Sequence, residues 1–336
     1  MIGKKCKVLA AAMCLSLAVS ACSSESPESE VTTTASASET TEAETAETSE
    51  TEESTEASSA ETTIEIVDNS FRFTTDNFPV FDGSTATKPL AIGIGTLLTG
   101  NPRETFESSM QFHRTDDAFY YLMDGTADIL VVAQPCQDIY DQMEEAGFEY
   151  EMEPIAMEGL VFIVNETNPV ESLTIEQVQD IYSGKITNWS EVGGLDQPIV
   201  PLQRTETSGS QVMMRECVMK DIPLMEVPTT MIPTEMGDLI EAVASFDNSS
   251  SNALGYTVYY YADSMGMADG LKILKINDVE PSNDSIASGE YPFTNPYFCV
   301  VPSGLENTDG AKIIYDWLVS EEGQKLVAAE GYVPVA

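Results

Sequence analysis

Apolar runs of strand length alternate along this chain with segments of helical periodicity. A short apolar run between turn signals is typical of a buried strand, whereas apolar residues spaced three and four apart indicate a helix. The strand-like runs are 127–135, 155–164, 198–203, 253–260, 271–276 and 297–301. The helical segments are 90–98, 118–123, 175–182, the stretch beginning at 212, and one or two terminal helices over 310–318 and 321–329. This alternation predicts an α/β fold.

The first 22 residues have the composition of an export signal. Lys4, Lys5 and Lys7 precede a stretch of small apolar residues, and the segment ends Val19-Ser-Ala-Cys22. This ending resembles a bacterial lipobox, which predicts a lipoprotein signal peptide over 1–22 with a lipid attached to Cys22. The apolar stretch is too short for a permanent transmembrane helix. The alternative is an ordinary cleavage site in a secreted protein.

Residues 23–62 consist almost entirely of Ser, Thr, Ala and Glu, with twelve Glu and no Lys or Arg. Such a segment buries too little apolar surface to offset its ordering entropy, so we expect a disordered acidic tether. The remaining 274 residues carry twelve basic and 44 acidic side chains, a net charge of −32. This charge argues against nucleic acid and anionic membrane surfaces as partners. It does not exclude a small anion, because local dipoles govern a buried site.

Three cysteines follow the signal: Cys136, Cys217 and Cys299. At most one intramolecular disulfide is possible, and the sequence leaves open whether any pair lies close enough. The chain has a single histidine, His113, and no CxxC motif. We therefore expect no metal site and no cofactor, with the thiols packed in the interior.

The stretch Arg204-Thr-Glu-Thr-Ser-Gly-Ser-Gln211 lies where a strand is followed by a helix. Backbone N–H groups are unpaired at a helix start, and the helix dipole favours negative charge there. Arg204 adds a planar fork of donors that matches an oxyanion, and Gly209 allows close approach to the backbone. The stretch predicts an anion site; the alternative is an ordinary Ser-capped helix with a surface arginine.

Two further helix starts are rich in hydroxyl groups. Ser84-Thr-Ala-Thr-Lys-Pro89 opens the first helical segment, with proline in the first turn. Thr115 precedes the second segment and is expected as its N-cap, with Asp116 and Asp117 in the first turn. Three helix starts on distant parts of the chain therefore share the chemistry of anion binding.

Several blocks together resemble one known family, the substrate-binding lipoproteins of Pst-type phosphate ABC importers. The blocks are 82–90, 182–189, 201–210, 286–292, 320–326 and 330–334, in this order. The resemblance spans roughly 78–334. It implies a two-lobed type II periplasmic-binding-protein clamp, with a mixed sheet flanked by helices in each lobe. Lobe 1 would comprise 63–160 plus 293–336 and lobe 2 would comprise 161–292, with crossing strands near 158–164 and 291–301.

The resemblance also implies which residues bind the ligand. Ser84, Thr85 and the Ala86 backbone N–H would act from the first loop, and Thr115 takes the place of a family serine. Arg204, Ser208, Gly209 and Ser210 would act from lobe 2. Glu206 takes the place of an aspartate that orients the arginine.

One position departs from the family pattern. Family members carry an aspartate at the end of the strand that here reads Leu130-Val-Val-Ala133. That aspartate accepts a proton from the ligand and so rejects fully ionised sulfate. Here Ala133 and Gln134 follow the strand; Gln134 can donate or accept a hydrogen bond but brings no charge. Asp116 is a candidate for the substitute acceptor.

The sequence supports three functions of different classes. The first is a monomeric, lipid-anchored protein on the outer face of the cell membrane that captures phosphate for the permease subunits of an ABC importer. The second is a binder or sensor of another oxyanion, such as a sulfate-like anion or an organic phosphate. The least supported is a phosphatase, because Ser208 has no evident partner base.

Overall fold

The computed structural model describes residues 73–244, 252–263 and 270–335, all within one compact unit. The expected signal peptide, the lipid attachment at Cys22 and the acidic tether lie outside these residues and stay predictions. Within the described part, no helix is long and apolar enough to cross a membrane.

The strands of the described part pair through one long central strand. They are β1 (Phe81–Gly83), β2 (Ile129–Val132), β3 (Tyr150–Asn165), β4 (Ser172–Leu173), β5 (Val200–Pro201), β6 (Ala253–Val258), β7 (Leu271–Ile276), β8 (Thr294–Pro302) and β9 (Val333–Pro334). Neighbours follow the order β1-β2-β8-β3-β6-β5, with β7 and β9 also paired to β3, and β4 paired to β7. β8, from the end of the chain, lies antiparallel between β2 and β3.

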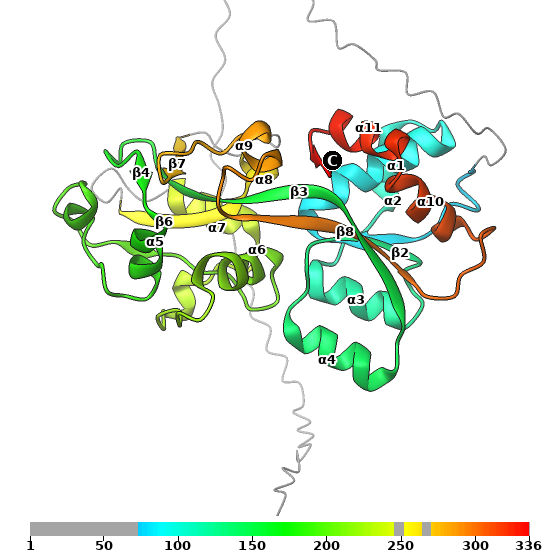
Figure 1. Cartoon of the computed structure of the whole chain (residues 1–336), viewed down its shortest axis with the longest axis horizontal. Helices are drawn as coiled ribbons and strands as arrows, with labels where there is room; N and C mark the ends of the chain where they lie inside the picture. Colours follow the sequence, from blue (N-terminus) through cyan, green and yellow to red (C-terminus); the bar gives the residue numbers. More distant parts are fainter. Residues whose placement is uncertain (1–72, 245–251, 264–269, 336) are drawn as a thin grey trace, which may run out of the picture. The chain divides into compact units, whose positions relative to one another are not determined.

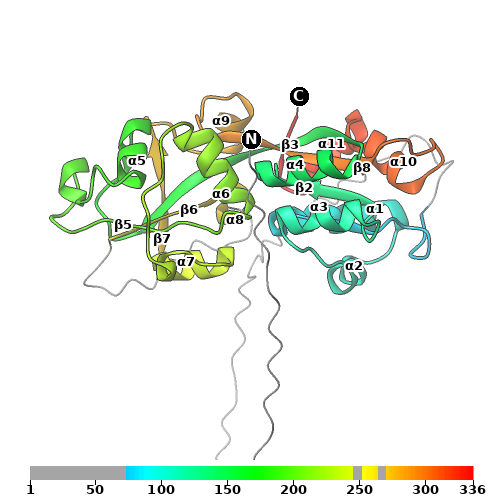
Figure 2. The same ribbon diagram turned by 90° about the horizontal axis from the view of Figure 1, so that it is seen from below.

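Two strands cross between two lobes (Figure 1). The first part of β3, Tyr150–Gly159, pairs with β8, and from Leu160 onward β3 pairs with β6 and β7. We define lobe 1 by β1, β2, β9 and the helices α1 (Lys88–Thr99), α2 (Arg103–Ser109), α3 (Thr115–Met123), α4 (Gln137–Ala146), α10 (Gly310–Leu318) and α11 (Glu321–Ala329). Lobe 2 holds β4 to β7 and α5 (Ile175–Tyr182), α6 (Gly209–Met213), α7 (Met236–Ala244), α8 (Tyr259–Asp263) and α9 (Asn283–Ala287). Helices flank the sheet in each lobe (Figure 2), which confirms the predicted α/β class.

The apolar sequence of β2 follows from burial on both faces. Ile129 and Val131 join the large core, whereas Leu130 and Val132 pack with α3 and α4 in a second cluster. The second cluster includes Phe119 from α3 and Met143 from α4. A strand held in this way gives the loops that follow β1 and β2 a rigid base.

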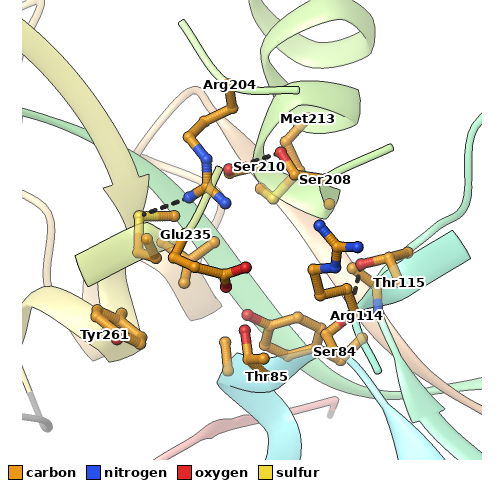
Figure 3. Close-up of a pocket in the computed structure, with 16 residues that line it drawn as sticks. Ser84, Thr85, Arg114, Thr115, Arg204, Ser208, Ser210, Met213, Glu235 and Tyr261 are labelled. Carbon is orange, nitrogen blue, oxygen red and sulfur yellow. Dashed lines mark hydrogen bonds between the residues drawn. The ribbon is translucent and has the colours of Figure 1, made fainter. Parts of the chain in front are cut away.

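The predicted helices at 175–182, 310–318 and 321–329 and the strand at 271–276 are confirmed. One prediction is wrong: the strand expected over 253–260 ends at Val258, and a short helix begins at Tyr259. Glu158 from β3 accepts a hydrogen bond from the backbone N–H of Tyr260, which stabilises this helix start. The turn brings Tyr261 toward the space between the lobes (Figure 3).

The three described cysteines are all free thiols. Cys299 is fully buried in the core, and Cys136 and Cys217 are half-buried. The expectation that these thiols pack in the interior is confirmed for Cys299, and no disulfide joins the three.

Candidate functional site

A pocket lies between the two lobes and collects most of the predicted site residues (Figure 3). Its cavity volume is about 50 Å³. The lining residues are Ser84, Thr85, Ala86, Arg114, Thr115, Ala133, Arg204, Ser208, Gly209, Ser210, Met213, Glu235, Met236, Val258, Tyr261 and Tyr297. Eight of the ten residues predicted for ligand binding are among them, and the other two, Gln134 and Glu206, are not.

The lobe 1 side is built from the loops that follow β1 and precede α3. The Ser84 and Thr115 hydroxyls lie 2.9 Å apart, and the backbone N–H of Ala133 donates to Ser84 Oγ at 2.9 Å. Both hydroxyl residues are buried, so their positions are fixed by these contacts. Ala86, in a 3-10 turn (Thr85–Thr87) before α1, accepts a hydrogen bond from the Tyr332 hydroxyl at 2.7 Å through its backbone oxygen.

Asp82 fastens these two loops together. Its carboxylate accepts from the backbone N–H groups of Gly83 at 2.7 Å and His113 at 2.9 Å. The other carboxylate oxygen lies 2.7 Å from His113 Nδ1. The single histidine of the chain therefore contacts Asp82, which holds the pocket loops in place, but does not itself line the pocket.

The start of α3 differs from the expected cap. Thr115 is the first residue of the helix, and the N-cap is Arg114, whose φ of 75° is unusual for a residue other than glycine. Thr115 cannot cap the helix from that position because its hydroxyl is turned toward Ser84. The turn at Arg114 places its guanidinium in the pocket (Figure 3), with one nitrogen 3.0 Å from Asp117 Oδ2.

The lobe 2 side begins at the start of α6. Ser208 is the N-cap and accepts a hydrogen bond from the backbone N–H of Gln211, as predicted for a Ser-capped helix. Its hydroxyl also lies 3.4 Å from that of Ser210. The helix continues without interruption into a π-helical turn (Met214–Met219). The small residues of this start face the hydroxyl groups of lobe 1.

At Gly209 the backbone of lobe 2 lies close to lobe 1 in the pocket wall. A Cβ placed on Gly209 would lie 2.8 Å from Thr115 Oγ1 and 2.9 Å from Ala133 Cβ, both in lobe 1. No side chain fits there without a shift of one lobe. The residue is glycine for reasons of space, since its φ is not in the left-handed region.

Arg204 is a buried cation without an acidic partner in the described part of the chain. Its residue is 5% exposed, one Nη donates to the Thr234 backbone oxygen at 2.9 Å, and the other lies 3.3 Å from Met236 Sδ. Nε is buried and has no hydrogen-bond partner. Burial lowers the pKa of Arg204, with the nearby Glu235 carboxylate opposing the shift. A buried guanidinium that has an unpaired N–H group and no carboxylate paired with it favours the binding of an anion.

Glu206 does not hold the position that the resemblance implied. Its carboxylate is exposed and pairs with Arg215 on the next helical segment, not with Arg204. The loop at Thr234 and Met236 orients Arg204 instead. The expectation that Glu206 orients Arg204 is therefore wrong.

Gln134 and Asp116 also lie outside the pocket lining. Asp116 is buried, and one carboxylate oxygen accepts from the backbone N–H of Cys136 at 3.1 Å. Burial raises the pKa of this carboxyl group. Its side chain stabilises the loop between β2 and α4, so the suggestion that Asp116 replaces the missing acceptor at the ligand is wrong in this structure.

Sequence reasoning missed two charged residues of the pocket, Arg114 and Glu235. A basic residue directly before a hydroxyl-rich helix start was visible at Arg114. Glu235 gave no local signal, because it belongs to an acidic chain and follows a Pro-containing loop. In the described residues, no group of three His, Cys, Asp or Glu side chains has the arrangement of a metal site.

Two lobes on crossing strands, with donors from both lobes around a small pocket, define a periplasmic-binding-protein clamp. The chain belongs to the PBP superfamily, whose domain model matches residues 106–322.

The chain is similar to phosphate-binding proteins PstS. The alignment with PstS of Bacillus subtilis shows 29% identity over 187 residues. It covers 54% of this chain and 56% of the relative. The match thus spans about half of that relative's length. The protein of Staphylococcus epidermidis strain RP62A is 26% identical over 262 residues, covering 75% and 77%.

A solved structure from Clostridium perfringens, described as a candidate phosphate ABC transporter substrate-binding protein with bound phosphate, is also similar. It superposes with a TM-score of 0.60 at 27% identity. The superposition covers 76% of this chain and 98% of that one.

Proposed function

We propose that this protein captures inorganic phosphate in the pocket between its lobes and delivers it to the permease of an ABC importer. The observation that carries the proposal is the buried guanidinium of Arg204, which has no carboxylate partner among the described residues. The names of the PstS relatives and of the phosphate-bound neighbour support the same ligand.

The proposed ligand contacts come from both lobes. Arg204, Ser208, Gly209 and Ser210 act from lobe 2, and Ser84, Thr85, Ala86 and Thr115 act from lobe 1. Hydroxyl and backbone N–H groups satisfy the anion's oxygens, and the guanidinium supplies charge. Because each lobe holds part of the set, an anion that contacts both stabilises the closed arrangement over an open one.

The size of the pocket favours a small ligand. A cavity of about 50 Å³ corresponds to about four water-sized positions. A tetrahedral oxyanion matches this space better than an organic phosphate does. The alternative ligand class is therefore another small oxyanion, in a binder or sensor of the same fold.

We place the protein outside the cytoplasm, as a monomer held to the membrane by a lipid on Cys22. The acidic tether would hold the two lobes away from the surface. The proposed lobe boundaries, 63–160 plus 293–336 and 161–292, put one crossing on β3 and the other on β8. A binding role is favoured over hydrolysis because the Ser208 hydroxyl contacts Ser210 and the Gln211 N–H, and no base lies beside it among the described residues.

Calorimetry with phosphate at pH 7 tests the proposal. We expect a dissociation constant in the micromolar range or below, and a rise in the thermal unfolding midpoint with ligand concentration. A panel of sulfate, molybdate and an organic phosphate separates the alternative ligands. Absence of both heat and protection with phosphate would rule out phosphate capture.

The proposed closure of the two lobes around the ligand leads to a prediction for a variant of Gly209. Replacing Gly209 with alanine should weaken phosphate binding by roughly 5- to 150-fold, because overpacking costs about 1–3 kcal/mol and the new methyl meets lobe 1. Calorimetry measures the loss. Gly237→Ala is the matched control, since a Cβ there meets nothing within 4 Å. Equal affinities for the two variants would show that the lobes need not approach at Gly209.

A further inference from the structure

We propose that Glu235 is the residue that selects a protonated oxyanion, by accepting a hydrogen bond from the ligand's own O–H group. This inference rests on the proposed function and adds to it the identity of the discriminating group. The assigned ligand class is a tetrahedral oxyanion that keeps a proton near neutral pH, as hydrogen phosphate does and sulfate does not.

Glu235 is the one acid among the residues that line the pocket. Its carboxylate points into the space that the Arg204 and Arg114 side chains also enter (Figure 3). Neither carboxylate oxygen has a hydrogen bond or an ion pair with another described residue. The residue is exposed in this structure, so water solvates the carboxylate until a ligand takes its place.

The position of Glu235 is coupled to that of Arg204. The guanidinium is held by the residues on either side of Glu235, through the Thr234 backbone oxygen at 2.9 Å and Met236 Sδ at 3.3 Å. The segment therefore presents a cation and an anion to the same ligand. An oxyanion bound to Arg204 brings one of its oxygens toward the Glu235 carboxylate.

The charges of the pocket decide which anions fit there. Two guanidinium groups, from Arg114 and Arg204, and one carboxylate face the cavity. An ionised carboxylate has only acceptor oxygens, so it needs a donor from the ligand. Hydrogen phosphate supplies an O–H, whereas sulfate presents only acceptors and would place like charges in contact. A carboxylate that loses its water to the ligand and gains no donor in return disfavours binding of the wrong anion.

The other candidate acids do not face the cavity. Asp116 lies outside the pocket lining with one oxygen bonded to the Cys136 N–H and the other without a partner among the described residues, Asp117 pairs with Arg114, and Glu206 pairs with Arg215. Ala133 lines the pocket with a methyl group alone. Of the described residues that line the cavity, Glu235 is the one whose side chain is a carboxylate and can accept, but not donate, a hydrogen bond when ionised.

Calorimetry with phosphate and sulfate on the wild-type protein and on Glu235→Gln tests this inference. Glutamine keeps the shape but can donate to a sulfate oxygen. The wild type should prefer phosphate by at least about 100-fold. In the variant, phosphate affinity should fall and sulfate affinity should rise, each by roughly 10-fold or more, the scale of one charge-assisted hydrogen bond. Asp238→Asn is the control, because Asp238 lies in the first turn of α7, the helix that Glu235 directly precedes, and is outside the pocket lining.

The outcomes separate the two proposals. If the wild type binds neither anion, phosphate capture fails and this inference fails with it. If the wild type binds phosphate and the phosphate-to-sulfate ratio is the same in Glu235→Gln, phosphate capture stands and the role of Glu235 is overturned. Unchanged thermal unfolding midpoints without ligand would show that a lowered ratio reflects selectivity and not misfolding.

Discussion

Replacing Arg204 with alanine is expected to weaken phosphate binding by roughly 10- to 150-fold. The estimate is the contribution of a hydrogen bond to a charged group, about 1.5–3 kcal/mol. Arg204 is the buried cation of the pocket, and its Nε has no partner in the described structure, so the guanidinium retains donor capacity for an anion. Titration calorimetry with phosphate at pH 7 measures the change.

Arg215→Ala is the matched control for this variant. Arg215 is exposed, pairs with Glu206 and does not line the pocket, so its loss should leave the affinity within about twofold. Arg204→Lys should fall between the wild type and Arg204→Ala, because lysine keeps the charge but loses the planar fork. If Arg204→Ala binds phosphate as the wild type does, the ligand must occupy another place.

The second large effect concerns Glu158, which lies in β3 at the crossing between the lobes. Its residue is 2% exposed, and Oε1 accepts from the backbone N–H groups of Gly159 at 2.8 Å and Tyr260 at 3.2 Å. Burial raises the pKa of this carboxyl group to about 7, from 4.5. The folded protein therefore holds a proton on Glu158 at a pH where the unfolded chain has lost it.

The sign of the pH dependence follows from that difference. The stabilisation from the protonated form is complete below pH 4.5 and is lost as the pH rises through 7. At about 1.4 kcal/mol per pKa unit, the free energy of unfolding should fall by about 3 kcal/mol across this range. The Glu158→Gln variant has no carboxyl group to ionise at this position and therefore lacks this pH-dependent loss of stability. The variant should be more stable than the wild type at pH 8.

Urea unfolding of both proteins between pH 4 and pH 8 measures the effect. The difference between the two free energies of unfolding at each pH gives the contribution of Glu158 alone. Other acids whose pKa values burial also raises, such as Asp116 and Glu330, contribute equally to both proteins and cancel. Parallel stability curves would mean that Glu158 ionises in the folded state as readily as in the unfolded chain.

The sequence predicted those parts of the fold that depend on local pattern. The helix at 175–182 was predictable because its apolar side chains share one face and Thr174 begins it with a capping box. The strand expected over 253–260 was too long because the sequence continues apolar through the tyrosines. The chain turns at Tyr259 because a carboxylate about a hundred residues earlier, Glu158, meets the next backbone N–H.

The candidate site also contains some residues that the local sequence predicts and others that depend on the tertiary structure. Hydroxyl groups and glycine at helix starts carry a local signal, and Ser84, Thr115 and Ser208 all line the pocket, although Thr115 is the first residue of its helix and not the N-cap. The groups around Arg204 could not be predicted, because they depend on where a loop thirty residues later comes to lie. A family correspondence assigned Glu206 to that role, but the carboxylate reaches Arg215 instead.

Lobe 1 is assembled from both ends of the folded chain. β8 separates β2 from β3, and the Tyr332 hydroxyl holds the Ala86 carbonyl at the pocket wall. The first loop of the pocket can form its contacts with Thr115 and Ala133 early in synthesis, but its contact with Tyr332 joins residues 246 positions apart and must form late. A chain shortened at its C-terminus should keep its early helices as isolated segments yet be unable to form the pocket. Under the export that we propose for this protein, the late completion of lobe 1 would keep the chain unfolded enough to be translocated.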